Sequence, residues 1–205
     1  MGGVVEGANM PIIRRIAAAL AGVFLCLACA HPVDVQALSP APPTILVAKK
    51  LSRPLFIVMD PASVKAEYPA PRIEKISNMQ AFVTRDVVKV MSEYFAEVKV
   101  VPSASAVPPG DTVVAVVKVD AFKDEHVILS GNGYTVLVMT WSFALKTADA
   151  EDYLFSFAGI AKSRPNEPSW DSAVTTMLEN ALTGLLDAWS KSGATEKLRS
   201  SATPS

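Results

Sequence analysis

One acidic–imidazole cluster, Asp124-Glu125-His126, combines residue types that can transfer protons or bind a metal ion. A metal site there would need ligands from distant segments, because the only other histidine of the chain is His31. We therefore interpret the cluster as a solvated turn that leads into a strand, and we expect no metal site.

Three further carboxylates, Asp149, Glu151 and Asp152, lie close together in a polar segment. Paired carboxylates can perform acid–base catalysis, but these fall where we predict a turn between two strands. The sequence has no GxSxG motif of a serine hydrolase, and the stretch 130–133 (SGNG) lacks the lysine of a phosphate-binding loop. We expect no catalytic residues and no cofactor. An exported enzyme is retained as a third hypothesis, because carboxylates can converge from distant positions.

The two cysteines, Cys26 and Cys29, lie at the end of an apolar run over residues 16–28 that follows Arg14 and Arg15. Positive residues, a short apolar run and small residues at its end are typical of a secretory signal peptide. The run is shorter than the about 20 apolar residues that a transmembrane helix needs. We predict a signal peptide over residues 1–29, with translation starting at Met1 or at Met10.

The end of this leader allows two cleavage sites. The sequence 26–29 (CLAC) is similar to a lipobox, in which a small residue precedes the cysteine that receives the lipid, although its first two residues depart from the usual ones. Alternatively, 28–30 (ACA) is an A-x-A site, and cleavage before His31 would release a soluble protein. The proline-rich stretch that follows favours lipidation of Cys29, because it could serve as a tether.

Hydrophobic periodicity divides the rest of the chain. We expect a flexible proline-rich tether over residues 30–50, a single domain over 51–193 and a disordered tail over 194–205. Patterns of apolar residues predict strands at 55–59, 98–101, 112–122, 134–146 and 153–161, and helices at 77–94 and 170–191.

Local signals mark the ends of these elements. Ser77 and Gln80 have the spacing of a capping box, Ser169 would cap the second helix, and Gly193 would end it. Asn132-Gly133 indicates a type I′ hairpin turn. Because each helix has one apolar stripe, both should lie on one face of the sheet. The sequence thus predicts an α+β fold, a two-layer sandwich with a mainly antiparallel sheet and two helices on one face.

The formal net charge of −1 argues against a nucleic-acid partner, which would favour a basic excess. Lys49, Lys50 and Arg53 form only a small basic cluster beside the expected tether.

The leader, the proline-bearing tether and the order of elements together resemble small Gram-negative envelope lipoproteins, in particular the auxiliary lipoproteins of ABC-type lipid transporters and the YajG-like group. The resemblance implies a non-enzymatic accessory role at the periplasmic face of the outer membrane. It also implies anchoring through a lipid on Cys29 and an envelope protein as partner. Ala30 in place of aspartate after the cysteine is compatible with sorting onward from the inner membrane.

Two functions other than catalysis therefore stay open. The first is a lipid-anchored binding or assembly module, for which a partly exposed Trp170 could mark a contact surface. The second is a soluble periplasmic carrier of lipid or another apolar ligand. A carrier would need a cavity between helices and sheet, lined by Trp141, Phe143, Leu182 and Leu186.

Overall fold

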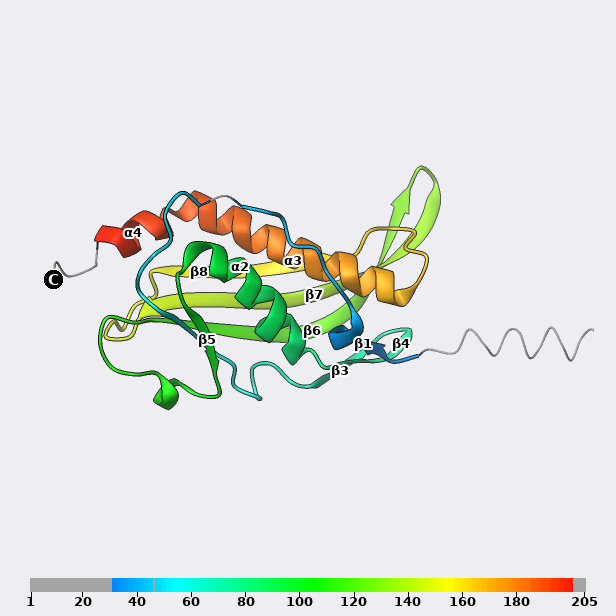
Figure 1. Cartoon of the computed structure of the whole chain (residues 1–205). Helices are drawn as coiled ribbons and strands as arrows, with labels where there is room; N and C mark the ends of the chain where they lie inside the picture. Colours follow the sequence, from blue (N-terminus) through cyan, green and yellow to red (C-terminus); the bar gives the residue numbers. More distant parts are fainter. Residues whose placement is uncertain (1–30, 46, 201–205) are drawn as a thin grey trace, which may run out of the picture. The chain divides into compact units, whose positions relative to one another are not determined.

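The computed structural model of the protein describes residues 31–45 and 47–200 (Figure 1). The strands are β1 (Val33–Asp34), β2 (Leu55–Val58), β3 (Glu67–Ala70), β4 (Ile73–Ser77), β5 (Val98–Val101), β6 (Val113–Leu129), β7 (Asn132–Thr147) and β8 (Phe155–Lys162). The helices are α2 (Val88–Tyr94), α3 (Trp170–Ser192), α4 (Ala194–Ser200), the π-helix η2 (Phe82–Val87) and the 3-10 turns η1 (Val35–Ala37) and η3 (Ala104–Ala106). No helix among these residues is both long and apolar enough to span a membrane.

The main sheet has five strands in the order β5-β2-β6-β7-β8. β2 runs parallel to β5 and β6, whereas β6, β7 and β8 are successive antiparallel neighbours. The pairing of β6 with β7 is the longest of these, because it extends from Val113–Thr147 to Leu129–Asn132. The predicted α+β fold is confirmed, with antiparallel pairing over most of the sheet and parallel pairing at β2.

Helices α2 and α3 lie on the same face of this sheet (Figure 1). Alternate side chains of β7 point toward them and are at most 1% exposed: Leu137, Met139, Trp141, Phe143 and Leu145. Phe82 of η2 packs edge-on against Trp141 with ring centroids 5.5 Å apart. Trp189 of α3 packs against Phe155 of β8 at 5.1 Å. The two-layer arrangement follows from this burial of apolar side chains.

A small second sheet, in the order β1-β4-β3, includes two strands between residues 67 and 77, where we predicted no strand. β4 pairs antiparallel with β3 and parallel with β1. Tyr68 of β3 donates a hydrogen bond to the carbonyl of Val119 at 3.0 Å, and its ring packs on Phe122 at 5.2 Å. These contacts attach the small sheet to β6.

The segment expected to be a flexible tether, residues 30–50, contains folded structure from β1 onward. Val33 and Asp34 pair with Ile76 and Ser77 of β4. The side chains of Val33 and Val35 are fully buried. The tether expectation is corrected here because apolar residues between the prolines enter the core, which the proline content of the segment concealed. The domain begins at about Val33 and not at residue 51.

Arg85 of η2 holds this N-terminal segment from the helix side. Its guanidinium donates to the carbonyls of Gln36 at 3.1 Å and Val35 at 3.3 Å. The same group forms a two-pronged ion pair with Asp86, at 2.7 and 2.8 Å. The N-terminal segment is therefore attached both by its strand pairing with β4 and by the hydrogen bonds of Arg85.

The tail expected to be disordered from residue 194 also contains a helix. Gly193 ends α3 with a φ of 65°, as predicted, and α4 follows directly. Ala194 and Leu198 are fully buried, and Trp189 donates from its indole N–H to the Thr195 hydroxyl at 3.0 Å. Residues 201–205 lie outside the described part of the chain.

Ser77 does not cap the first helix, contrary to the sequence prediction. It is the last residue of β4, and its hydroxyl donates to the carbonyl of Val33 at 3.3 Å. Asn78 then turns the chain with a φ of 54°. Because Ser77 belongs to β4, it is not available as a helix cap. The helix therefore starts later than predicted and continues from η2 into α2.

The hairpin turn also lies two residues earlier than predicted. Ser130 and Gly131 have φ values of 51° and 82°, and a type I′ turn requires positive φ at both central positions. Asn132 already pairs with Leu129. Gly133 is not a turn residue. It leaves room for the His126 ring, because a Cβ at this position would lie 2.5 Å from Nε2 of His126.

If Val33 and Val35 belong to the core, the double substitution V33A/V35A should lower the free energy of unfolding by about 3 kcal/mol, since each removes buried methyl groups. Denaturant unfolding of the mature protein measures this loss. The exposed neighbour variant Q36A should change stability by less than about 0.5 kcal/mol. Equal, negligible effects of both variants would restore the tether interpretation.

Candidate functional site

The structure places Asp124, Glu125 and His126 inside β6, not in a turn that precedes a strand. Because side chains alternate along a strand, Asp124 and His126 face one side and Glu125 the other. Asp124 accepts a hydrogen bond from Arg72 at 3.1 Å. Both oxygens of Glu125 accept from Lys162, at 2.9 and 2.8 Å. The cluster therefore does not converge on one point, and its two acids brace the hairpin instead.

The Lys162–Glu125 ion pair crosses over β7. Glu125 pairs in the sheet with Val136, and Lys162 pairs with Val138, and both valines are buried. The hydrogen bond from Lys162 lowers the pKa of Glu125 below its ordinary value. The carboxylate is consequently ionised at neutral pH and acts as a structural partner of the lysine.

Asp149, Glu151 and Asp152 lie in the connection between β7 and β8, as predicted, and all three are exposed. Within residues 31–45 and 47–200, no three His, Cys, Asp or Glu side chains are grouped so that they could hold a metal ion.

The residues that would line a carrier's cavity are instead part of the packed core. Trp141, Phe143, Leu182 and Leu186 are between 0% and 5% exposed. Trp141 is flanked by the rings of Phe82 and Phe157, with centroids 5.5 and 5.3 Å away. Trp170, which we expected to be partly exposed, is half-buried against this core.

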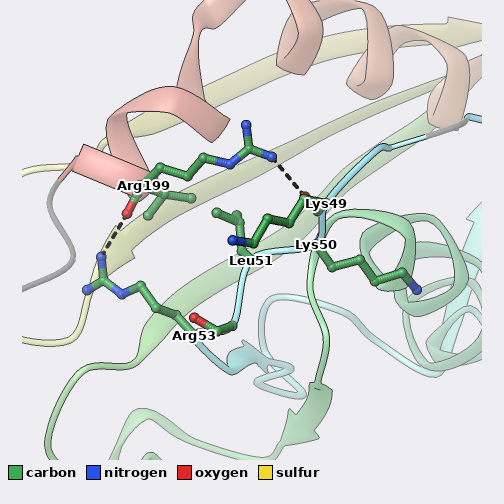
Figure 2. A pocket seen from close by; sticks show the side chains of 7 residues that line it. Lys49, Lys50, Leu51, Arg53 and Arg199 are labelled. Atoms are coloured by element: carbon green, nitrogen blue, oxygen red, sulfur yellow. Dashed lines mark hydrogen bonds between the residues drawn. The ribbon is translucent and has the colours of Figure 1, made fainter. Parts of the chain in front are cut away.

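The most distinctive surface feature is a basic pocket between residues 49–53 and α4, with a volume of about 290 Å³ (Figure 2). It is lined by Lys49, Lys50, Leu51, Ser52, Arg53, Leu198 and Arg199. Positive side chains outnumber other types here, so an anion is the class of ligand that the charge of this basic pocket favours.

Much of this positive charge is already engaged within the fold. Arg199 donates to the carbonyl of Lys49 at 2.8 Å, and the buried Arg53 donates to the carbonyl of Leu198 at 3.4 Å (Figure 2). Arg53 also forms an ion pair with Asp111 at 2.5 Å. The hydrogen bonds of Arg53 and Arg199 therefore attach α4 to residues 49–53, which lead into β2. We call this attachment the joint.

Sequence reasoning recognised Lys49, Lys50 and Arg53 as a cluster but missed Arg199. The partners Arg199 and Lys49 lie 150 residues apart, so no local spacing links them. Leu198, which is fully buried, is the single apolar residue late in α4 that could have suggested its docking.

A second, larger pocket of about 500 Å³ lies beside η2. Its lining is mostly polar: Gln36, Met59, Asn78, Gln80, Ala81, Thr84 and Arg85. π-helical turns occur frequently at functional sites, but Arg85 is held here by Asp86, which raises the pKa of the guanidinium through its hydrogen bond. The guanidinium N–H groups of Arg85 thus donate to Asp86 and to the carbonyls of the N-terminal segment.

Cys29, the predicted lipidation site, lies outside the described residues. Its modification stays a prediction from the sequence.

The joint between α4 and Arg53 can be tested by substitution. R53A should lower the free energy of unfolding by about 1–3 kcal/mol, because it removes a buried ion-pair and hydrogen-bond partner. D111N should cost less than about 1 kcal/mol, since Asp111 is 53% exposed. Hydrogen exchange at α4 should accelerate in R53A alone, and unchanged protection there would contradict the joint.

Comparison with known proteins gives support at the level of the fold. A solved structure from Xanthomonas campestris, assigned to the DUF330 family, is 12% identical, covers 83% of this chain and 99% of its own, and gives a TM-score of 0.53. At that identity the likeness shows the fold alone.

Two further solved structures are less similar. A neuraminyllactose-binding hemagglutinin homolog from Helicobacter pylori has 12% identity, 79% and 98% coverage and a TM-score of 0.45. A minor lipoprotein from Acinetobacter baumannii has 10% identity, 68% and 93% coverage and a TM-score of 0.39. No protein-family model and no curated protein matches the sequence.

Proposed function

We propose that the mature protein is an accessory binding or assembly module, anchored by a lipid on Cys29 to the periplasmic face of the outer membrane. The observation that carries this proposal is the CLAC motif at 26–29 placed directly before a folded domain, whose first strand begins at Val33. A lipidated cysteine would be the first residue of the mature chain.

The short connection changes how such an anchor would act. Four residue steps separate Cys29 from Val33, and each spans at most about 3.5 Å, so the lipid attachment point would lie within about 14 Å of β1. Since Val33 and Asp34 are paired with β4, no long tether separates the domain from the bilayer.

The acidic–imidazole cluster gives no support to the alternative of an exported enzyme. Asp124 and Glu125 are each occupied by a different cation, on opposite faces of β6. A soluble carrier would have its ligand cavity where Trp141 and Leu182 are packed, so the carrier function becomes an outcome of the test below.

Mass spectrometry of the mature N-terminus tests the anchor directly. We expect an acylated Cys29, and we expect C29A to leave the membrane fraction. A mature chain that begins at His31 and occurs only in the soluble fraction would replace this function with a soluble periplasmic one.

Substitution of Ala30 tests the proposed outer-membrane location. If sorting reads the residue after the lipidated cysteine, A30D should move the protein from the outer to the inner membrane on a density gradient, whereas A30S should not. Wild-type protein found in the inner membrane would refute the outer-membrane location while leaving the anchor in place.

A further inference from the structure

We propose that the tip of the β6–β7 hairpin, residues 127–134, is a second membrane contact that rests on the phospholipid surface. The inference rests on the proposed function, because the lipid on Cys29 is what brings the domain to a bilayer. The hairpin tip is drawn as a projection away from the helices and the rest of the sheet (Figure 1).

The hairpin tip displays apolar side chains that nothing in the described fold covers. Ile128 is 72% exposed and Leu129 is 47% exposed, and they point to opposite sides of the two-stranded ribbon. The tip contains no charged residue, and the first charged residues along the two strands are Glu125 and Lys146. An uncharged tip with isoleucine, leucine and Tyr134 fits the boundary between headgroups and acyl chains.

The direction of β1 shows which end of the small sheet its first residue faces. β1 is parallel to β4, so the residues before Val33 approach from the side where β4 begins at Ile73. The turn before β4 carries Arg72, which binds Asp124 at the base of the hairpin. Val33, the residue that follows the proposed anchor after four residue steps, is therefore the end of β1 that faces the base of the hairpin.

The distances are compatible with simultaneous contact. Five residue steps from Asp124 to Leu129, at about 3.4 Å each, carry the tip about 17 Å beyond the Arg72 ion pair. The lipid attachment point has a reach of about 14 Å from Val33. Val33 lies beside Ile76, four residue steps from Arg72, so a fully extended chain before Val33 reaches about as far as Arg72. Because the tip extends beyond this level, contact of both with one bilayer requires that the domain lean toward the hairpin.

Two ion pairs lie at the base of the hairpin. The Arg72–Asp124 and Lys162–Glu125 ion pairs brace it from both faces, with N–O distances of 3.1 and 2.8 Å. Beyond the end of β8, which pairs no further than Val138, the ribbon has outward backbone groups without strand partners. Such groups need water, so the contact is a shallow one at headgroup depth.

Spin labelling can measure this contact in the acylated full-length mature protein, reconstituted in vesicles of phosphatidylethanolamine and phosphatidylglycerol. Cys29 is acylated in that protein and Cys26 is removed with the leader, so an introduced cysteine is the only free thiol. We expect a label at L129C to lose most of its accessibility to a water-soluble relaxation reagent when vesicles are present. A label at D187C, exposed near the end of α3 away from the tip, should stay accessible (Figure 1).

A matched variant isolates the apolar side chains. With the label at S130C, the substitutions I128S and L129S should restore accessibility, because they remove the apolar contact and leave the acyl anchor. Equal accessibility at L129C and D187C in acylated protein would overturn the inference and leave the proposed function intact.

Two other outcomes are also decisive. If mass spectrometry finds no acyl chain on Cys29, the proposed function fails, and this inference fails with it. If the tip label is accessible in vesicles but protected in native envelope fractions, the tip docks on a protein, and the membrane contact is refuted.

Discussion

The fold depends on burying one strip of side chains along β7. Leu137 through Leu145 point alternately into the same layer, and η2 and α3 must both cover them. Trp141 lies at the centre, and its indole N–H has no hydrogen-bond acceptor among the described residues. The rings of Phe82 and Phe157 surround it edge-on, and aromatic contacts of this kind offset part of the cost of that buried N–H. The sheet and the helices η2 and α3 are held together by this layer.

Strong periodic patterns were predictable from the sequence, and short elements with distant partners were not. The alternation of β7 and the stripe of α3 each repeat over many residues, so a single window identifies them. β1 has two residues, and α4 has one apolar residue late in a polar segment. Their positions depend on pairing with β4 and on the joint with residues 49–53, which no local pattern encodes. Ser77 shows the same limit, because strand pairing outweighed its capping signal.

The candidate sites divide in the same way. The residue types of Asp124, Glu125 and His126 suggested chemistry, but the strand places them on alternate faces and Arg72 and Lys162 occupy the acids. The basic pocket was half visible, since Arg199 joins it only in the folded chain. Ile128 and Leu129 look like core residues in the sequence. Only the folded hairpin shows that both side chains are exposed.

The joint between Arg199 and the Lys49 carbonyl has a consequence for the order of folding. It connects the first and last parts of the domain, so this contact forms only when nearly the whole chain is available. Contacts of such high sequence separation slow folding, because loop closure must come first. A chain that crosses a membrane with its N-terminus leading would thus form this joint only after its final helix emerges. The attachment of α4 would then be completed on the far side of that membrane, after the core of the sheet.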